Sequence, residues 1–189
     1  MDLITLHRRA GENWQRTLEA VQADQWDDPT PCREWNVRQL VNHIVNEDLW
    51  TVPLLEGKTI ADVGDQFDGD VLGDDPVAKS SVTWAEAAAA VDKHLPEGGM
   101  VSVSWGQIPA EEYVRQLFAD HLIHAWDLAA ATGQSRDLDP ELVVEVAAWF
   151  APNEDMIRSA GVIAERPDLG GDPQTELLAG YGRRADWSA

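Results

Sequence analysis

The sequence has few cysteines and few basic residues. Cys32 is the one cysteine in 189 residues, so the chain can form neither an internal disulfide nor a zinc site built from several cysteines. Lysine and arginine together number 14 against 34 aspartates and glutamates, which gives a formal net charge of −20. Because such a chain repels phosphate backbones and anionic lipids, we expect no nucleic acid and no membrane surface among its partners.

Long apolar segments are also missing. No run approaches the ~18 apolar residues that a membrane-spanning helix needs. The start of the chain, Met1 to Ile4, has neither the basic nor the apolar region of a secretory signal. We therefore expect a cytoplasmic protein. The length of 189 residues, with 44% hydrophobic and 25% charged residues, is typical of one globular domain held by a hydrophobic core.

The apolar residues recur mostly at helical spacing, which predicts an all-α fold. The expected helices cover residues 3–21, 36–50, 83–94, 109–132 and 139–150, the third of them opening on a capping box formed by Thr83 and Glu86. Residues 56–81 are acidic and glycine-rich and are expected to form a long loop able to cover a site. Residues 100–105 alternate as at most a short strand. The chain thus divides into a helical bundle over 1–165 and a C-terminal tail, 166–189, that docks on it.

The predicted helix over residues 109–132 carries the most informative pattern. It is apolar nearly all round, with one narrow polar stripe whose members lie within about 40° of Asp120 on a helical wheel. These members are Gln116, Asp120, His124 and Asp127. A helix on a protein surface shows the opposite pattern, a narrow apolar stripe and a broad charged face. The stripe therefore indicates carboxylates and an imidazole gathered at a site.

This stripe contains a candidate metal-binding pair. Asp120 and His124 are four residues apart, so they lie one turn apart on one face, the spacing at which a helix offers two ligands to one metal. His43, at the edge of the apolar face of the helix over 36–50, is a candidate third ligand. Three protein ligands leave open coordination positions, as catalytic metal sites do. Glu47 and Asp127 are candidates for orienting the ligands. The residues alone leave two other interpretations open, a surface ion pair and a hydrogen-bonded core histidine.

The other histidines are expected elsewhere. His121 lies ~100° around the helix from Asp120, so it is expected to face away from the pair, although it remains an alternative ligand. His7 and His94 are expected at the surface.

Two sequence motifs resemble those of a known group of proteins. Residues 31–43 contain P-C-x-x-W followed by L-x-x-H, and residues 124–133 read H-x-W-D-L-A-x-A-T-G. Both resemble the actinobacterial maleylpyruvate isomerase N-terminal, or mycothiol-binding, families of the DinB-like superfamily. Residues 69–76 and the tail from Asp172 to Trp187 fit the same group.

The resemblance implies a DinB-like four-helix bundle that holds a divalent metal, zinc or nickel. Carried over residue by residue, the metal ligands are His43, Asp120 and His124. The best-understood relatives carry glutamate where this chain has Asp120. The resemblance also implies mycothiol as a cosubstrate, and it allows a homodimer.

Three functions are compatible with these residues. The first is a metal-dependent enzyme that uses a small-molecule thiol, mycothiol, for S-transfer or isomerisation on an electrophilic small molecule. The second is a metal-assisted hydrolase with Glu47 or Asp127 as the base. The third is a non-catalytic bundle that binds a small molecule or a metal at a degraded site, which the replacement of glutamate by Asp120 would favour. The sequence assigns no catalytic residue and no substrate.

Overall fold

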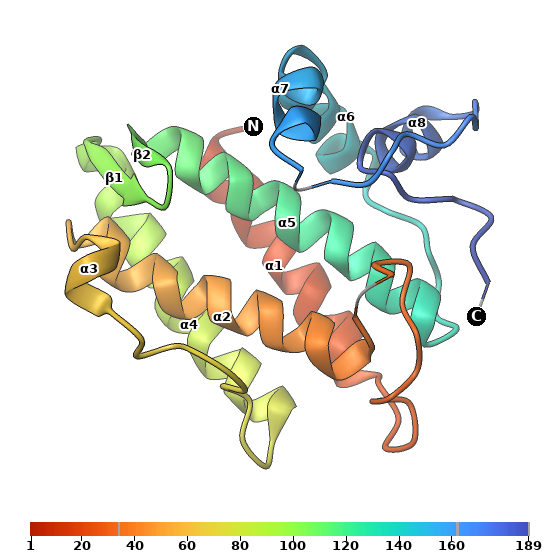
Figure 1. The fold of residues 1–189 in the computed structure, drawn as a ribbon, viewed down its shortest axis with the longest axis horizontal. Helices are drawn as coiled ribbons and strands as arrows, with labels where there is room; N and C mark the ends of the chain where they lie inside the picture. The colour runs from red at the N-terminus through yellow and green to blue at the C-terminus, as the bar shows by residue number, and fades with distance from the viewer. Residues whose placement is uncertain (34, 162, 189) are drawn as a thin grey trace.

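Four long helices form the body of the molecule. A computed structural model describes residues 1–33, 35–161 and 163–188. The bundle consists of α1 (Leu3–Glu19), α2 (Val37–Leu55), α4 (Pro76–His94) and α5 (Ala110–Ala131). Helix α5 packs against α1 and α2, and α4 packs against the same two helices (Figure 1). The prediction of an all-α four-helix bundle is confirmed.

Shorter elements join and flank the bundle. They are α3 (Ile60–Val63), strands β1 (Met100–Val103) and β2 (Gly106–Pro109), α6 (Pro140–Phe150), α7 (Glu154–Ser159) and α8 (Pro173–Gly180), with short 3-10 helices at Leu95–Glu97 and Ala151–Asn153. The two strands pair antiparallel, from Met100 opposite Pro109 to Val103 opposite Gly106. The hairpin lies at one end of the bundle, whereas α6 and α8 lie beside α5 on the side away from α2 (Figure 1).

The burial of α5 follows from its composition. Leu122, Ile123 and Trp126 pack into a core cluster shared with α1, α6 and α8. Ala125 and Leu128 point into a second cluster with α1 and α2. Helix α5 is therefore covered on several sides, as its nearly continuous apolar surface predicts.

The start of α4 differs from the expectation. The helix begins at Pro76 rather than at Thr83, because the side chain of Asp75 caps it by accepting a hydrogen bond from the Ala78 N–H (3.0 Å) and proline is well suited to a first helical turn. Thr83 lies inside the helix, where its hydroxyl donates to the Lys79 carbonyl. The expected loop over 56–81 is correspondingly shorter, and it also contains α3.

Two further element boundaries differ from those predicted from the sequence. Residues 100–109 form a hairpin rather than a single strand, because Gly106 at φ +141° allows the chain to reverse. Helix α2 continues past Pro53 to Leu55. A proline so close to the end of a helix removes only one backbone hydrogen bond of the last turns.

The C-terminal residues contribute to the core. Leu177 and Leu178 on α8 are buried in the cluster that contains Leu122 and Trp126 of α5. Tyr181 and Trp187 in the same segment pack against this cluster. The division of the chain at residue 165 stays a prediction.

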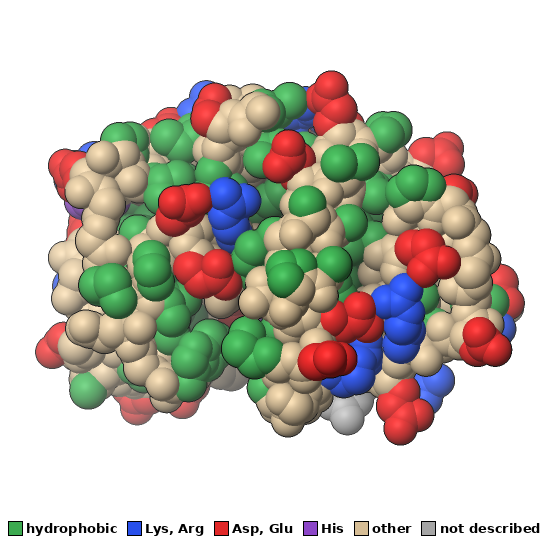
Figure 2. All heavy atoms as spheres, turned by 90° about the horizontal axis from the view of Figure 1, so that it is seen from above, with side chains coloured by type: hydrophobic (Ala, Val, Ile, Leu, Met, Phe, Trp, Pro, Cys, Tyr) green, Lys and Arg blue, Asp and Glu red, His purple; other side chains and the backbone are tan. Residues whose placement is uncertain are grey.

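The face shown in Figure 2 carries acidic side chains that do not gather in one patch. On the face shown in Figure 2, Asp and Glu side chains are scattered, and Lys and Arg side chains lie mostly next to them. Among the described residues, no helix combines the length and the hydropathy that crossing a bilayer would require.

Candidate metal centre

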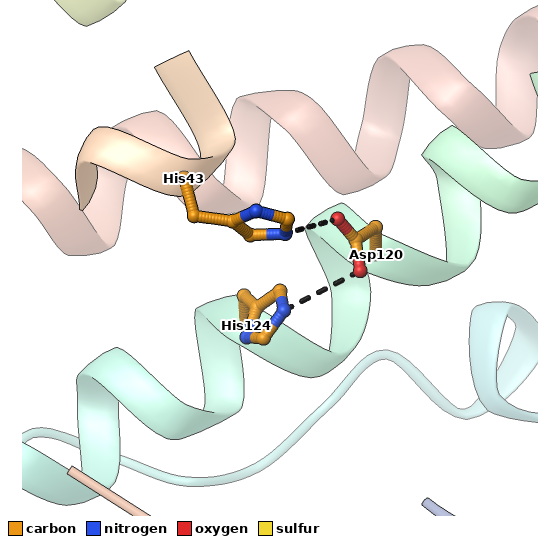
Figure 3. A group of neighbouring side chains, drawn as sticks. All are labelled: His43, Asp120 and His124. Carbon is orange, nitrogen blue, oxygen red and sulfur yellow. Dashed lines mark hydrogen bonds and ion pairs between the residues drawn. The ribbon is translucent and has the colours of Figure 1, made fainter. Parts of the chain in front are cut away.

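His43, Asp120 and His124 meet between α2 and α5. Each offers one ligand atom, and these three atoms all lie within 4.8 Å of one another. Asp120 lies between the two imidazoles: His43 Nε2 donates to its Oδ2 (2.9 Å), and His124 Nε2 forms an ion pair with its Oδ1 (3.4 Å) (Figure 3). Although aspartate is shorter than glutamate, Asp120 therefore reaches both histidines.

The chemistry of this donor set fits a divalent metal ion. Two imidazole nitrogens and one carboxylate oxygen are a ligand set that zinc accepts and that leaves a coordination position open. Imidazole also suits nickel. Within the part of the chain that the structure describes, this is the one group of three or more such side chains close enough to share an ion.

The electrostatics of the site favour an ionised carboxylate. Burial raises the pKa of Asp120, but the imidazoles of His124 and His43 outweigh burial and hold that pKa well below its ordinary value. For His124, burial lowers the pKa, but Asp120 and Asp127 together raise it to about 9. A metal ion at His124 Nε2 would therefore displace a proton.

Through Nδ1, His124 is linked to a buried series of polar contacts. His124 Nδ1 donates to Asp127 Oδ2 (2.9 Å), and Asp127 is fully buried on α5. Arg183, in the turn that follows α8, donates from Nε to Asp127 Oδ1 (3.1 Å) and from Nη2 to Oδ2 (2.8 Å). Burial raises the pKa of Asp127, but Arg183 and His124 lower it below its ordinary value.

Trp35 covers the two histidines. Its ring centroid lies 4.6 Å from that of His43 and 5.8 Å from that of His124. It belongs to the P-C-x-x-W motif, and the isolated bridge between Pro29 and Asn36 brings the segment back onto the start of α2. The ring therefore shields one side of the ligand set from water.

A groove of about 550 Å³ opens beside His43. Its walls come from α2, from the segment before it and from the acidic loop. They are formed by Trp35, Asn36, Arg38, Gln39, Asn42, His43, Asn46, Gly69 and Asp70. A volume of this size is typical of small-molecule sites.

The acidic loop is fastened along α2. Asn42 donates to the Gly69 carbonyl (3.0 Å) and accepts from the Val71 N–H (2.8 Å), and Asn46 donates to the Phe67 carbonyl (2.6 Å). Arg38 forms an ion pair with Asp70 (2.9 Å). The loop thus forms one wall of the groove, next to a candidate metal ligand.

Glu47 lies near the ligand set. It follows His43 by one turn of α2, and its carboxyl interacts electrostatically with His43 and Asp120. Burial raises its pKa.

His121 faces away from the ligand set, as expected. Its Nδ1 donates to the Leu117 carbonyl (2.9 Å), and its Nε2 lies 3.3 Å from Asp48 Oδ1, with both side chains buried. The expectation for His7 was wrong. His7 is 1% exposed and packs against Trp84 and His121, because the helical face of Leu3, Leu6 and Ala10 that points to α5 extends to it.

Sequence reasoning missed the roles of Trp35 and Arg183 at this site. Trp35 belongs to the P-C-x-x-W motif, but nothing in that pattern indicates that its ring contacts the two histidines. Arg183 stood in the matched tail segment, yet no spacing rule connects it with Asp127, 56 residues away in the chain.

Comparison with known proteins places the chain in a family. The family model described as mycothiol maleylpyruvate isomerase N-terminal domain matches residues 7–129. Two uncharacterized proteins, from two strains of Mycobacterium tuberculosis, are each 36% identical to it over 155 residues, which covers 77% of this chain and 75% of each relative.

Solved structures share the fold. A crystal structure of the mycothiol-dependent maleylpyruvate isomerase matches with a TM-score of 0.71 at 16% identity, covering 98% of this chain and 91% of that one. A point mutant of that isomerase matches with a TM-score of 0.68, also at 16% identity, covering 88% and 75%. These likenesses confirm the DinB-like bundle. Together with the match over residues 7–129, they lead to the conclusion that the chain belongs to the mycothiol maleylpyruvate isomerase N-terminal domain family.

Proposed function

We propose that this protein is a metal-dependent enzyme that uses a small-molecule thiol, mycothiol, for S-transfer or isomerisation on an electrophilic small molecule. The observation that carries the proposal is the meeting of His43, Asp120 and His124, of which His43 also lines a groove of about 550 Å³. The family match supports mycothiol as the thiol. The single cysteine need not react, because the nucleophile is supplied by the cosubstrate.

We assign different roles in the proposed reaction to different residues of the chain. His43, Asp120 and His124 would hold a zinc or nickel ion, which when bound stabilises the thiolate form of a thiol ligand. Glu47 is the group that we assign to accept the thiol proton at its carboxylate. Trp35 limits the access of water to the histidines, and the groove orients the thiol and the substrate. The thiolate is then the nucleophile.

The first experiment measures metal. We expect about one zinc or nickel per chain by elemental analysis, and we expect Asp120→Asn and His43→Ala to lose it. His94→Ala is the matched control, because its partner among the described residues is Glu97, away from the ligand set, and it should keep the metal. Stoichiometric metal in both ligand variants would contradict the ligand assignment.

The second experiment tests the thiol. With cobalt(II) in place of the native metal, adding mycothiol should produce a near-ultraviolet thiolate-to-cobalt absorption band. Metal binding without this band, combined with hydrolysis of a test ester or amide in the absence of thiol, would favour the hydrolase. Failure of the wild-type protein to retain any metal would favour the non-catalytic binder. The cytoplasmic location and the homodimer stay predictions.

A further inference from the structure

Arg183 is among the few buried charged side chains of the described residues. It is 8% exposed, and its guanidinium N–H groups donate to the Asp127 carboxylate and to the Tyr181 carbonyl. Nε and Nη2 face the two oxygens of Asp127, and Nη1 donates to the Tyr181 carbonyl (2.9 Å). A guanidinium that contacts a carboxylate through two nitrogens fixes the orientation of that carboxylate as well as its charge.

The consequence for Asp127 is that its carboxylate is held in one orientation. Asp127 has 0% exposure, and among the described residues its hydrogen-bonding partners are Arg183 and His124. A guanidinium that contacts both oxygens holds the Asp127 carboxylate toward His124 Nδ1. The imidazole is thereby held with its Nε2 directed at Asp120 and the ligand set.

The backbone after α8 holds Arg183 in position. Gly182 has φ +74°, and its N–H donates to the Ala179 carbonyl (2.9 Å) while the Arg183 N–H donates to the Leu178 carbonyl (2.8 Å). These two bonds form a Schellman motif, which ends a helix and fixes the direction of the next residue. A Cβ at Gly182 would lie 2.7 Å from the Ala164 carbonyl oxygen, so glycine is also required by space.

We infer that Arg183 is a positioning residue for His124, acting through Asp127, and that the segment after α8 is therefore a functional part of the metal centre rather than an appended tail. This inference rests on the metal site proposed above. In other metal sites, the carboxylates that orient a ligand histidine typically change metal affinity about 10- to 100-fold when replaced.

The test compares Arg183→Met and Asp127→Asn with Arg184→Met. Arg184 is the matched control, because it is the neighbouring arginine and, within the described part of the chain, its guanidinium pairs with Asp186 on the surface. Zinc affinity is measured by competition with a chromogenic chelator. Both Arg183→Met and Asp127→Asn should weaken zinc binding about 10- to 100-fold. The double variant should lose little more than the weaker-binding single variant, and Arg184→Met should stay within about twofold of the wild type.

A second measurement distinguishes a role of Arg183 in positioning His124 from a purely structural role in holding the C-terminal segment. In protein labelled with ¹⁵N-histidine, the proton on His124 Nδ1 should give a low-field NMR signal that is lost or exchanges rapidly in Arg183→Met and in Asp127→Asn. An unchanged zinc affinity in Arg183→Met would overturn the inference. A weaker zinc affinity would also overturn it if the proton signal stayed intact and the losses multiplied in the double variant. Both results are expected if Arg183 only holds the C-terminal segment on the bundle.

Two outcomes, a variant that does not fold and a wild-type protein that binds no zinc, require a further variant or a different measurement. If Arg183→Met does not fold, judged by its far-UV circular dichroism, Arg183→Lys replaces it; lysine keeps the charge and loses the paired contact, so an intermediate loss supports the inference and no loss overturns it. If the wild-type protein binds no zinc, the proposed function fails, but the Nδ1 proton signal of the metal-free protein still decides the role of Arg183.

Discussion

His7 and His124 are both buried, and their neighbours give them opposite acidities. His124 contacts Asp120 and Asp127, which raise its pKa to about 9 against the effect of burial. His7 packs against the rings of Trp84 and His121, and burial, assisted by His121, lowers its pKa to about 3. The same residue type is therefore charged at one position and neutral at the other, and the difference comes entirely from its surroundings.

The lowered pKa of His7 predicts a loss of stability in acid. Between pH 6.5 and about 3 the unfolded chain binds a proton at His7 that the folded protein does not, so the free energy of unfolding falls as the pH decreases through this window. From pH 7 to pH 5 the expected contribution is about 2 kcal/mol. Urea unfolding of the wild type and of His7→Leu at both pH values measures it. Equal pH dependence in the two proteins would refute a neutral buried His7.

At the scale of elements, the packing of α1 on α4 depends on one glycine. Gly11 on α1 is buried, and a Cβ at this position would overlap the ring atoms Cη2 and Cζ2 of Trp84 on α4. The ring of Trp84 is itself 8% exposed, so it has little room to move. The close approach of the two helices is what places Trp84 against His7 and His121.

Gly11→Ala should therefore destabilise the protein, although alanine favours a helix over glycine by about 1 kcal/mol. Overpacking of a dense core costs about 1–3 kcal/mol, and the direct overlap with the ring places this case at the upper end. The free energy of unfolding from urea titration should fall by about 1–2 kcal/mol. In a Trp84→Phe background, where the overlapping ring atoms are absent, the same substitution should be neutral or stabilising. A gain in stability in the wild-type background would contradict this packing.

The loop before α4 is the second element that the site depends on. Asn42 holds it with two hydrogen bonds, on either side of Asp70. Two such bonds contribute about 1–3 kcal/mol, so Asn42→Ala should open the loop locally without unfolding the bundle. Amide hydrogen exchange over residues 67–73 should become about tenfold faster or more. Asn13→Ala on α1 is the control and should leave this segment unchanged; equal protection in both variants would show that the loop is held by other contacts.

For the whole molecule, the charge of −20 is the dominant electrostatic property. The acidic side chains are spread over the surface in Figure 2, and the basic side chains that lie among them neutralise only part of this charge. Repulsion of this kind destabilises a compact state, and it is screened by salt.

We therefore expect the thermal stability to rise with ionic strength. Increasing NaCl from about 20 to about 300 mM shortens the Debye length severalfold, and the melting temperature should rise by about 3 °C, the equivalent of about 1 kcal/mol for a domain of this size. Circular dichroism melts at constant pH measure it, with sucrose at equal osmolality as the control for solvent effects that do not involve charge. A melting temperature that falls with salt would indicate that the surface ion pairs contribute more than the net repulsion.

Helical periodicity is enough to place part of the candidate site and to predict the burial of α5. The spacing of Asp120, His124 and Asp127 fixes them on one face wherever the helix lies, because an α-helix has 3.6 residues per turn. The apolar residues around that stripe required α5 to be buried. The family motifs pointed to His43 as the third member of the group.

Which residues meet across the bundle depends on the packing of the folded chain. The approach of His43 to Asp120, the contact of Arg183 with Asp127 and the burial of His7 under Trp84 each join residues more than 50 positions apart. Such contacts depend on how helices cross and how their side chains interdigitate, which no local pattern encodes. The predicted start of α4 at Thr83 was wrong because Asp75 caps the helix ahead of Pro76, and Ser80, Thr83 and Trp84 are buried within the longer helix.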